Sequence, residues 1–198
     1  MIIDGHRGAE AAKLAALSDE ELAALAVVDK GHALPLLIRR HETSVFRLIR
    51  SHVGDADEAR DLTQETFVAA YLALRRYDPE RPFRAWMATI AINKCRDWAR
   101  RRAVRRFLTF AAPLDAVALR VAGDEVPADV ATDDRMLLER VAAAIPALPV
   151  ALKEPLILCA IEGHSQAQAA DILGISEKAV ETRIRRARTA LQEKLSRS

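Results

Sequence analysis

The residue types best suited to chemistry lie near the end of the sequence, on one side of a predicted helix. The apolar residues of this segment fall on the opposite side, which is typical of a helix that packs by one face. Ammonium and guanidinium groups on the free face can donate to DNA phosphates, and a guanidinium can bind guanine through two hydrogen bonds. The alternative is a solvated basic face without a ligand. The basic face comprises Lys178, Thr182, Arg185 and Arg186 at helical spacing, with Arg183 and Arg188 beside them.

A second basic segment, 93–106, holds seven basic residues against one acid. The loop before its helix, 77–82, contains two prolines, which exclude a helix there, and aromatic residues flank it. Basic side chains beside aromatic rings suit single-stranded or melting DNA better than an intact duplex. Trp86 and Trp98 fall on or beside the apolar stripe of the helix, and we expect both to pack in the core.

A third pattern lies on the predicted helix 57–76. One stripe, which includes Phe67 and Leu74, is apolar and is predicted to face the core. The other stripe combines acids with aliphatic side chains, so this helix is predicted to have one buried and one exposed face. The second stripe consists of Asp61, Gln64, Glu65, Val68 and Leu72.

Local signals predict that helices position all of these residues. Capping boxes open helices at Ser18 and Ser165, and Pro155 either kinks the helix 149–162 or marks its true start. Aromatic residues make up only 5% of the chain and β-type alternation is nowhere sustained, so the predicted fold class is all-α. A short helix, a glycine turn and a long basic helix form a helix-turn-helix at the end. The predicted helices are 19–30, 32–53, 57–76, 83–106, 134–145, 149–162, 166–173 and 177–195.

The charge pattern divides the chain into domains. The segment 107–134 loses helical periodicity and carries six acids against one base, although the whole chain has a net charge of only +2. Such a composition indicates a solvated connection. We therefore predict two small helical domains, 1–106 and 134–198, joined by a flexible acidic linker at 107–133.

Several other function classes find no support in the sequence. Cys95 and Cys159 stand far apart in apolar stretches and are predicted to be free thiols. The five histidines lack metal-ligand spacing, and there is no phosphate-binding glycine loop or nucleophile motif. We therefore expect no metal, no cofactor and no enzyme activity. No apolar run approaches the ~18 residues of a membrane helix and no secretory signal is visible, so we expect a cytoplasmic protein without membrane insertion.

The motifs Asp61-Leu-Thr-Gln-Glu-Thr-Phe67, Phe83-Arg-Ala-Trp86 and Ile90-Ala-Ile-Asn-Lys-Cys-Arg-Asp-Trp-Ala-Arg-Arg-Arg102 resemble region 2 of the extracytoplasmic-function, or group 4, sigma factors of the sigma-70 family. The motifs Leu148-Pro149, Glu162-Gly-His-Ser165, Ala169-Ala-Asp-Ile-Leu-Gly-Ile175 and Ala179-Val-Glu-Thr-Arg-Ile-Arg-Arg-Ala-Arg188 resemble region 4. Order and spacing match from about Leu17 to Leu195, with the acidic segment in the linker position.

The resemblance implies a subunit that directs core RNA polymerase to promoters, in a stress or signal response under the control of an anti-sigma factor. Region 2 is expected to bind the β′ clamp helices and to melt the −10 element, and region 4 to bind the β flap and read the −35 element. The expected polymerase-binding residues are Asp61, Gln64, Glu65, Val68 and Leu72. The expected −10 residues are Arg76, Tyr77, Asp78, Arg81, Phe83, Asn93, Lys94, Arg96, Arg100 and Arg101. The expected −35 residues are Ser176, Lys178, Glu181, Thr182, Arg183, Arg185, Arg186 and Arg188.

Two alternatives remain open. A sigma-like decoy would bind an anti-sigma factor without touching promoters, but the basic segment 93–106 is present and argues against it. An ordinary helix-turn-helix regulator would explain 166–195 and leave 61–102 without a function. Glu181 departs from the family pattern, since many relatives carry a basic residue there. Because an acid repels phosphate and can accept from cytosine N4, the −35 sequence cannot be taken from a relative.

Overall fold

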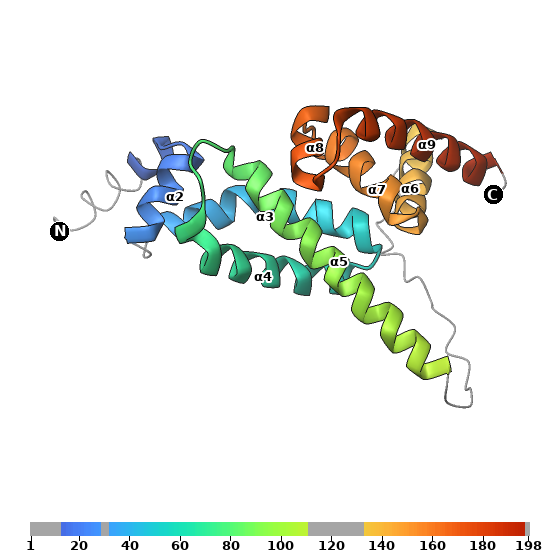
Figure 1. The fold of residues 1–198 in the computed structure, drawn as a ribbon, viewed down its shortest axis with the longest axis horizontal. Coiled ribbons are helices and arrows are strands. Elements are labelled where there is room, and N and C mark those ends of the chain that lie inside the picture. Colours follow the sequence, from blue (N-terminus) through green and yellow to red (C-terminus); the bar gives the residue numbers. More distant parts are fainter. Residues whose placement is uncertain (1–12, 29–31, 111–132, 197–198) are drawn as a thin grey trace.

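The structure is a computed structural model that describes residues 13–28, 32–110 and 133–196. Every regular element in these ranges is helical, which confirms the predicted fold class (Figure 1). No helix in the described residues is both long and apolar enough to cross a membrane. The elements are α2 (Asp19–Val28), α3 (Ala33–Val53), α4 (Ala56–Ala73), η1 (Leu74–Arg76), α5 (Phe83–Phe110), α6 (Asp133–Ala144), η2 (Ile145–Ala147), α7 (Val150–Leu156), η3 (Ile157–Ile161), α8 (Gln166–Leu173) and α9 (Glu177–Ser196).

The N-terminal unit, residues 13–110, packs α2, α4 and α5 against α3. α3 buries its apolar side chains at helical spacing and ends at Gly54, whose φ of 85° lies in the left-handed region that glycine adopts without strain. The Asp55 side chain then accepts hydrogen bonds from the backbone N–H groups of Asp57 and Glu58 and so starts α4. A glycine and an acidic cap therefore set the sharp turn that brings α3 and α4 together.

The helix α5 is longer than predicted. It continues to Phe110, beyond the predicted end at Arg106, because no glycine or proline interrupts the chain before Pro113. Its C-terminal half extends past the other helices of the N-terminal unit (Figure 1). The rest of the predicted linker, 111–132, lies outside the described residues.

The C-terminal unit, residues 133–196, contains the predicted helix-turn-helix. Ser165 and Gln168 form the capping box that opens α8, and Gly174, with φ 67°, ends it in the left-handed conformation. The long helix α9 then buries Val180, Ile184 and other apolar side chains against α7 and α8. The local sequence signals were thus sufficient to predict this motif.

The helix around Pro155 resolves the alternative left open by the sequence. α7 begins at Val150 and contains Pro155, so the proline does not mark its start. A proline has no N–H to donate and disturbs the regular pattern. The chain responds with the wider turn η3, a π-helix in which the Glu162 N–H donates to the Ile157 carbonyl at 3.0 Å. This turn directs Glu162 toward the N-terminal unit.

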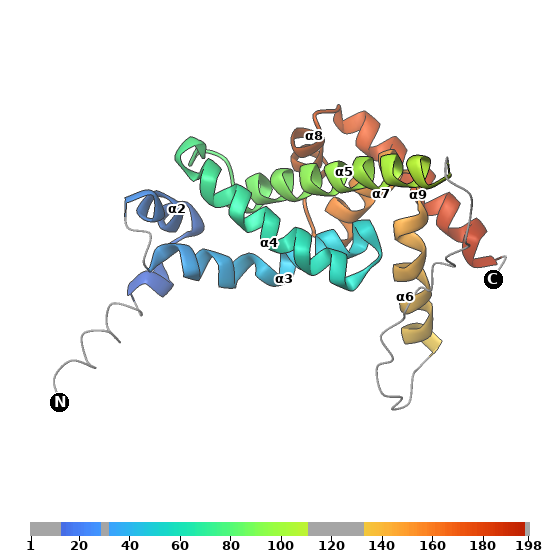
Figure 2. The same cartoon turned by 90° about the horizontal axis from the view of Figure 1, so that it is seen from below.

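The two units lie against each other, an arrangement that the sequence did not predict. η2, η3 and α8 contact α3 and α5. Figure 2 shows α8 beside α5, while α6 projects away from the N-terminal unit. At the contact a Cβ on Gly54 would stand 2.8 Å from the Pro146 ring, so the close approach itself requires glycine.

Candidate nucleic-acid and polymerase interfaces

The basic residues of α9 lie on the face that points away from the core of the C-terminal unit. Val180 and Ile184 are buried on the inner side of the helix. Arg185, Arg186 and Arg188 are exposed on the outer side. The helix therefore presents guanidinium groups to solvent, which is the geometry that a DNA-reading helix needs.

The residues at the start of α9 already have partners within the chain. The Ser176 hydroxyl accepts the Ala179 N–H at 3.2 Å, so this side chain caps the helix. Lys178 Nζ lies 3.0 Å from Glu181 Oε2, and the hydrogen bond and charge of Lys178 lower the pKa of Glu181. Thr182 and Arg183 are only half-exposed. Positive charge on this face is thus strongest in the middle of the helix rather than at its beginning.

A hollow of about 440 Å³ adjoins the same face, between α9, η3 and α8. Gln166, the first residue of α8, lines it together with Arg185, Arg188 and Thr189. Glu181 also lines the hollow, and the Thr189 hydroxyl donates to the Arg185 carbonyl at 3.3 Å. The amide of Gln166 and the guanidinium groups of Arg185 and Arg188 are the donors that suit a phosphate oxygen there. Gln166 and Thr189 were not among the predicted site residues. The position of Gln166 directly after the helix cap was the available signal.

The predicted −10 loop, 77–82, has a defined backbone. The Arg81 N–H donates to the Asp78 carbonyl at 3.0 Å, and the Glu80 N–H donates to Asp78 Oδ1 at 3.0 Å. The Tyr77 hydroxyl donates to the Arg81 carbonyl at 2.5 Å and closes the loop. Burial, with the nearby charges of Glu20, Asp78 and Asp19, raises the pKa of Tyr77 to about 12, so the phenol keeps the proton that it donates. Asp78, Arg81 and the preceding Arg76 have exposed side chains.

The aromatic residues beside this loop face inward. Phe83 is only 4% exposed, and its ring centroid lies 5.4 Å from that of Tyr77 and 5.4 Å from that of Trp86. A buried ring cannot stack on a base, so the predicted base contact of Phe83 is corrected to a packing role. Tyr77 is half-buried in the same cluster. Trp98 is also buried, and its indole N–H donates to Glu58 at 2.7 Å, in accord with the predicted core packing.

The basic residues of α5 are divided among several partners. Lys94 Nζ lies 3.3 Å from a Glu65 carboxylate oxygen, and Arg101 lies 3.8 Å from the same oxygen. Arg100 forms an ion pair with Asp97 one turn away. These contacts are exposed or half-exposed, so water and nucleic acid can still reach the cations.

Asn93 and Arg96 differ sharply in accessibility although both were predicted to face DNA. The Asn93 side chain is exposed, as expected for an outward residue. Arg96 instead binds Glu154 of the C-terminal unit through two hydrogen bonds of 2.8 and 2.6 Å. The prediction of Arg96 as a free outward residue is therefore wrong for this arrangement of the units. The sequence carried no signal for the contact, because the partners are 58 positions apart.

The predicted stripe on α4 lies on the outer surface. Asp61 and Gln64 are exposed, and the aliphatic residues Val68 and Leu72 are 59% and 75% exposed. Glu65 is only half-exposed because it faces the basic residues of α5. Val68 and Leu72 lie one helical turn apart, so together they form a small exposed apolar patch on this stripe.

Comparison with known proteins assigns both units. Residues 37–105 match the family model of sigma-70 region 2, and residues 138–191 match that of sigma-70 region 4. The chain is 42% identical over 176 residues to the RNA polymerase sigma factor CnrH of Cupriavidus metallidurans. The aligned residues cover 88% of this chain and 92% of CnrH. The chain belongs to the extracytoplasmic-function sigma factors of the sigma-70 family. Members of this family are transcription factors without catalytic activity.

Two solved structures resemble this sigma factor over most of its length. One is CnrH in complex with the cytosolic domain of CnrY, at 36% identity and a TM-score of 0.67, covering 91% of this chain and 98% of that chain. The other is the sigma factor RpoE of Bartonella quintana in complex with the anti-sigma factor NepR, at 25% identity and a TM-score of 0.65, covering 80% and 94%. The likeness extends over both regions of the sigma factor.

Region 4 of this sigma factor carries a buried carboxylate that meets two cations of region 2. The Glu162 side chain is 1% exposed and accepts hydrogen bonds from Arg47 at 2.8 and 3.1 Å. Arg84 Nη2 lies 3.5 Å from Glu162 Oε2 and also donates to the Glu162 backbone carbonyl. The hydrogen bond and charge of Glu162 raise the pKa of Arg47. The two regions are thus held together by ion pairs with one deeply buried partner.

A second polar cluster surrounds Glu154. Desolvation would raise the pKa of Glu154, but the two hydrogen bonds from Arg96, the charge of Arg96 and the nearby His52 outweigh it and the pKa is lowered. His52 Nε2 stands 3.5 Å from Glu154 Oε1, and neither ring nitrogen finds a hydrogen-bond partner among the described residues. Desolvation is the largest effect on His52 and lowers its pKa. Lys153, also buried, donates to the His52 carbonyl at 2.7 Å and the Pro146 carbonyl at 3.1 Å.

Proposed function

We propose that three separate surfaces of this sigma factor carry out promoter recognition. The α4 stripe binds core RNA polymerase through its β′ clamp helices, and region 4 also contacts the β flap. The 77–82 loop with the basic part of α5 binds the −10 strand. The outer face of α9 binds the −35 duplex. Because it acts on core polymerase, the protein works in the cytoplasm.

The single observation that carries this proposal is the exposure of Val68 and Leu72 beside Asp61 on α4. An ordinary helix-turn-helix regulator has no need for a second, protein-binding surface in a separate unit. Here that surface lies in the unit matched to region 2, while the arginine-bearing face lies in the unit matched to region 4. An assignment to polymerase also explains why acids accompany the aliphatic residues, since charge complementarity steers association.

The side chains that bind the −10 strand in this proposal are those that are exposed in the structure. Asp78 and Arg81 are exposed on a loop whose backbone hydrogen bonds limit its freedom, which reduces the entropy lost when a base binds. Asn93 supplies an exposed amide on α5. Arg96 can reach DNA only after it leaves Glu154.

Regulation by an anti-sigma factor is part of the proposal. The relatives CnrH and RpoE were solved with the cytosolic domain of CnrY and with the anti-sigma factor NepR, respectively. A protein partner of that kind suits the exposed aliphatic residues of α4, which would otherwise remain in water in the free chain.

Run-off transcription with core polymerase over a randomised promoter library tests the proposal. Wild-type protein should direct initiation at a defined set of promoters, and an absence of transcription would favour the decoy. Asp61→Lys should weaken binding to core polymerase at least about tenfold, equal to about 1.4 kcal/mol, without a change in melting temperature. Glu42→Lys is the matched control, because Glu42 is an exposed acid on α3, away from the stripe. Equal binding by both variants would contradict the assignment of α4.

A further inference from the structure

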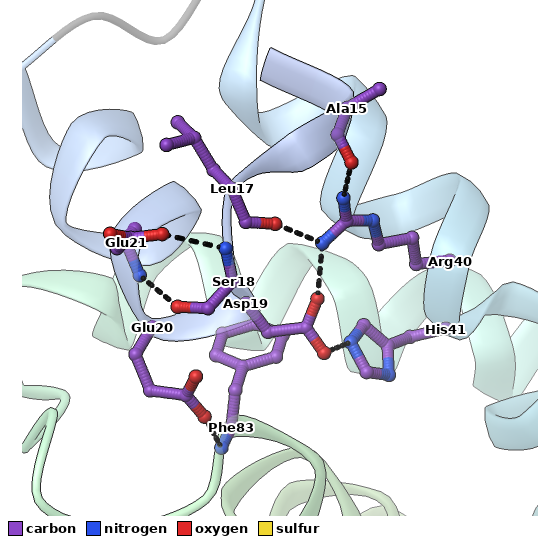
Figure 3. A network of polar contacts seen from close by, with 9 residues as sticks. All are labelled: Ala15, Leu17, Ser18, Asp19, Glu20, Glu21, Arg40, His41 and Phe83. Atoms are coloured by element: carbon purple, nitrogen blue, oxygen red, sulfur yellow. Dashed lines mark hydrogen bonds and ion pairs between the residues drawn. The ribbon is translucent and has the colours of Figure 1, made fainter. Parts of the chain in front are cut away.

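The first turn of α2 touches the start of α5 through one carboxylate. Glu20 Oε1 accepts the backbone N–H of Phe83 at 3.2 Å, and Phe83 is the first residue of α5 (Figure 3). The first N–H groups of a helix have no partner within it and carry partial positive charge. Glu20 therefore supplies from another helix the cap that the sequence before α5 lacks, since Pro82 has no side-chain acceptor.

Glu20 is itself held in place by contacts on both sides of it. The Ser18 hydroxyl accepts the Glu21 N–H at 3.1 Å, and Glu21 Oε2 accepts the Ser18 N–H at 2.7 Å. Asp19 binds Arg40 and His41 of α3, each at 2.8 Å (Figure 3). The two Asp19 bonds fix the first turn of α2 against α3, whereas the Ser18–Glu21 bonds lie within α2. The position of the Glu20 carboxylate is therefore set by the contact of α2 with α3.

Arg40 ties the chain before α2 to the same place. It donates to the Leu17 carbonyl at 2.9 Å and to the Ala15 carbonyl at 2.7 Å. The residues that lead into α2 are thus bound to α3 as well as its first turn. The capping carboxylate stands on an anchored segment rather than on a mobile end.

A displacement of Phe83 would move the loop that precedes it. The Phe83 ring lies 5.1 Å from the His41 ring and 5.4 Å from that of Tyr77, measured between centroids. The Tyr77 hydroxyl in turn binds the Arg81 carbonyl. α2 also packs against η1, which leads into the loop, so one helix contacts the chain on both sides of residues 77–82.

We propose that Glu20 is a positioning residue that fixes the start of α5 and so holds the 77–82 loop in the geometry that selects the −10 base. This role rests on the proposed −10 function of the loop and adds an element outside the region 2 match, which begins at residue 37. The side chain does not touch DNA in this role. It acts through the backbone of Phe83 on Asp78 and Arg81.

The test compares three full-length variants bound to core polymerase. Permanganate reactivity of −10 thymines measures how much open complex forms at promoters varied at each −10 position. The readout is the ratio of this reactivity between the best and the second-best base. Glu20→Ala should reduce that ratio about fivefold, equal to about 1 kcal/mol. Glu20→Gln keeps an oxygen acceptor and should restore most of the ratio. Glu21→Ala removes only the bond from the Ser18 N–H to Glu21 Oε2. It keeps the Asp19 contacts with α3 and the Glu20 contact with Phe83, so it should leave the ratio unchanged.

The controls separate positioning from general stability. Binding to core polymerase and to −35 duplex should be the same for all three variants. An unchanged ratio in Glu20→Ala, or an equal loss in Glu21→Ala, overturns the positioning role. The double variant Asp78→Ala/Arg81→Ala tests the loop itself: if the ratio changes there but not in Glu20→Ala, only the positioning role fails. If the loop variant leaves the ratio unchanged, the proposed function of the loop fails and the positioning role fails with it.

Discussion

Breaking the ion pair between Arg96 and Glu154 should show a clear asymmetry between its two partners. The Glu154 side chain is 4% exposed and the Arg96 side chain is 33% exposed. Arg96→Met leaves a buried carboxylate without the cation that donates hydrogen bonds to it, and buried charges that lose their partner destabilise proteins by about 3–5 kcal/mol. Glu154→Gln leaves a cation that can turn to water, so the loss should be about 1–2 kcal/mol.

The double variant Arg96→Met/Glu154→Gln measures the coupling free energy between the two side chains. Because Arg96→Met already removes the interaction, adding Glu154→Gln should cause no further loss and should recover part of the stability, since the buried charge is gone. Arg100→Met is the matched control on the same helix. Arg100 is 73% exposed, and its replacement should change the free energy of unfolding by less than about 0.5 kcal/mol.

Urea denaturation followed by circular dichroism measures the free energy of unfolding of each variant. Hydrogen exchange of the α7 amides measures separately how readily region 4 leaves region 2. Both measurements should rank Arg96→Met as the most destabilised variant. If Arg96→Met and Arg100→Met behave alike, the pair of Arg96 and Glu154 does not help to hold the two regions together. If the effects of Arg96→Met and Glu154→Gln simply add, the two side chains do not act as a pair.

Two further predictions concern the −35 face and the response to pH. Replacing Arg183, Arg185 and Arg186 with alanine should weaken binding to −35 duplex and lower the salt slope by about one unit per lost phosphate contact, as measured by fluorescence anisotropy. Arg39→Ala on α3 is the control, and an equal slope for both variants would contradict the DNA role of α9. The lowered pKa of His52 keeps it neutral when folded, while the unfolded chain takes up a proton below about pH 6.5. Burial also lowers the pKa of His164, which acts in the same direction. The free energy of unfolding should therefore fall between pH 7 and pH 5.5, and a constant value in urea titrations would show that neither histidine gains a proton on unfolding.

Helix boundaries were predictable because their signals act over one turn. The capping boxes at Ser18 and Ser165 and the glycine stops at Gly54 and Gly174 all appear in the structure as predicted. Each signal depends on residues within about four positions, and such hydrogen bonds form independently of the tertiary packing. The predicted end near residue 30 lies outside the described residues, and the helix predicted over 57–76 continues as a 3-10 turn after Ala73. The end of α5 was predicted too early, because a change of composition was taken for a helix end.

The exposure of a side chain was predictable where it depends only on the position of the residue around its own helix. The periodicity of α4 correctly separated Val68 and Leu72 from the buried side, and that of α9 separated Arg185 from Ile184. A stripe at helical spacing tells which residues cannot share the core face. It does not tell whether a second helix covers the other face.

The partners of charged residues were decided only by the tertiary structure. Arg96 looked like an outward cation and lies in the contact between regions, whereas Phe83 looked like a stacking ring and lies in the core. Glu154 and Glu162 gave no sign in the sequence that they would be buried. Their burial depends on how region 4 lies on region 2, and that arrangement pairs residues 58 to 115 positions apart.

The sequence by itself therefore determined the helices, the two regions and the exposed faces to which we assign their proposed functions, because short-range hydrogen bonds and helical periodicity act locally. The docking of the two regions and the link from Glu20 to Phe83 were decided by the tertiary structure alone. Coulomb attraction depends on distance in space, and charged side chains far apart in the chain become partners only after the helices have packed.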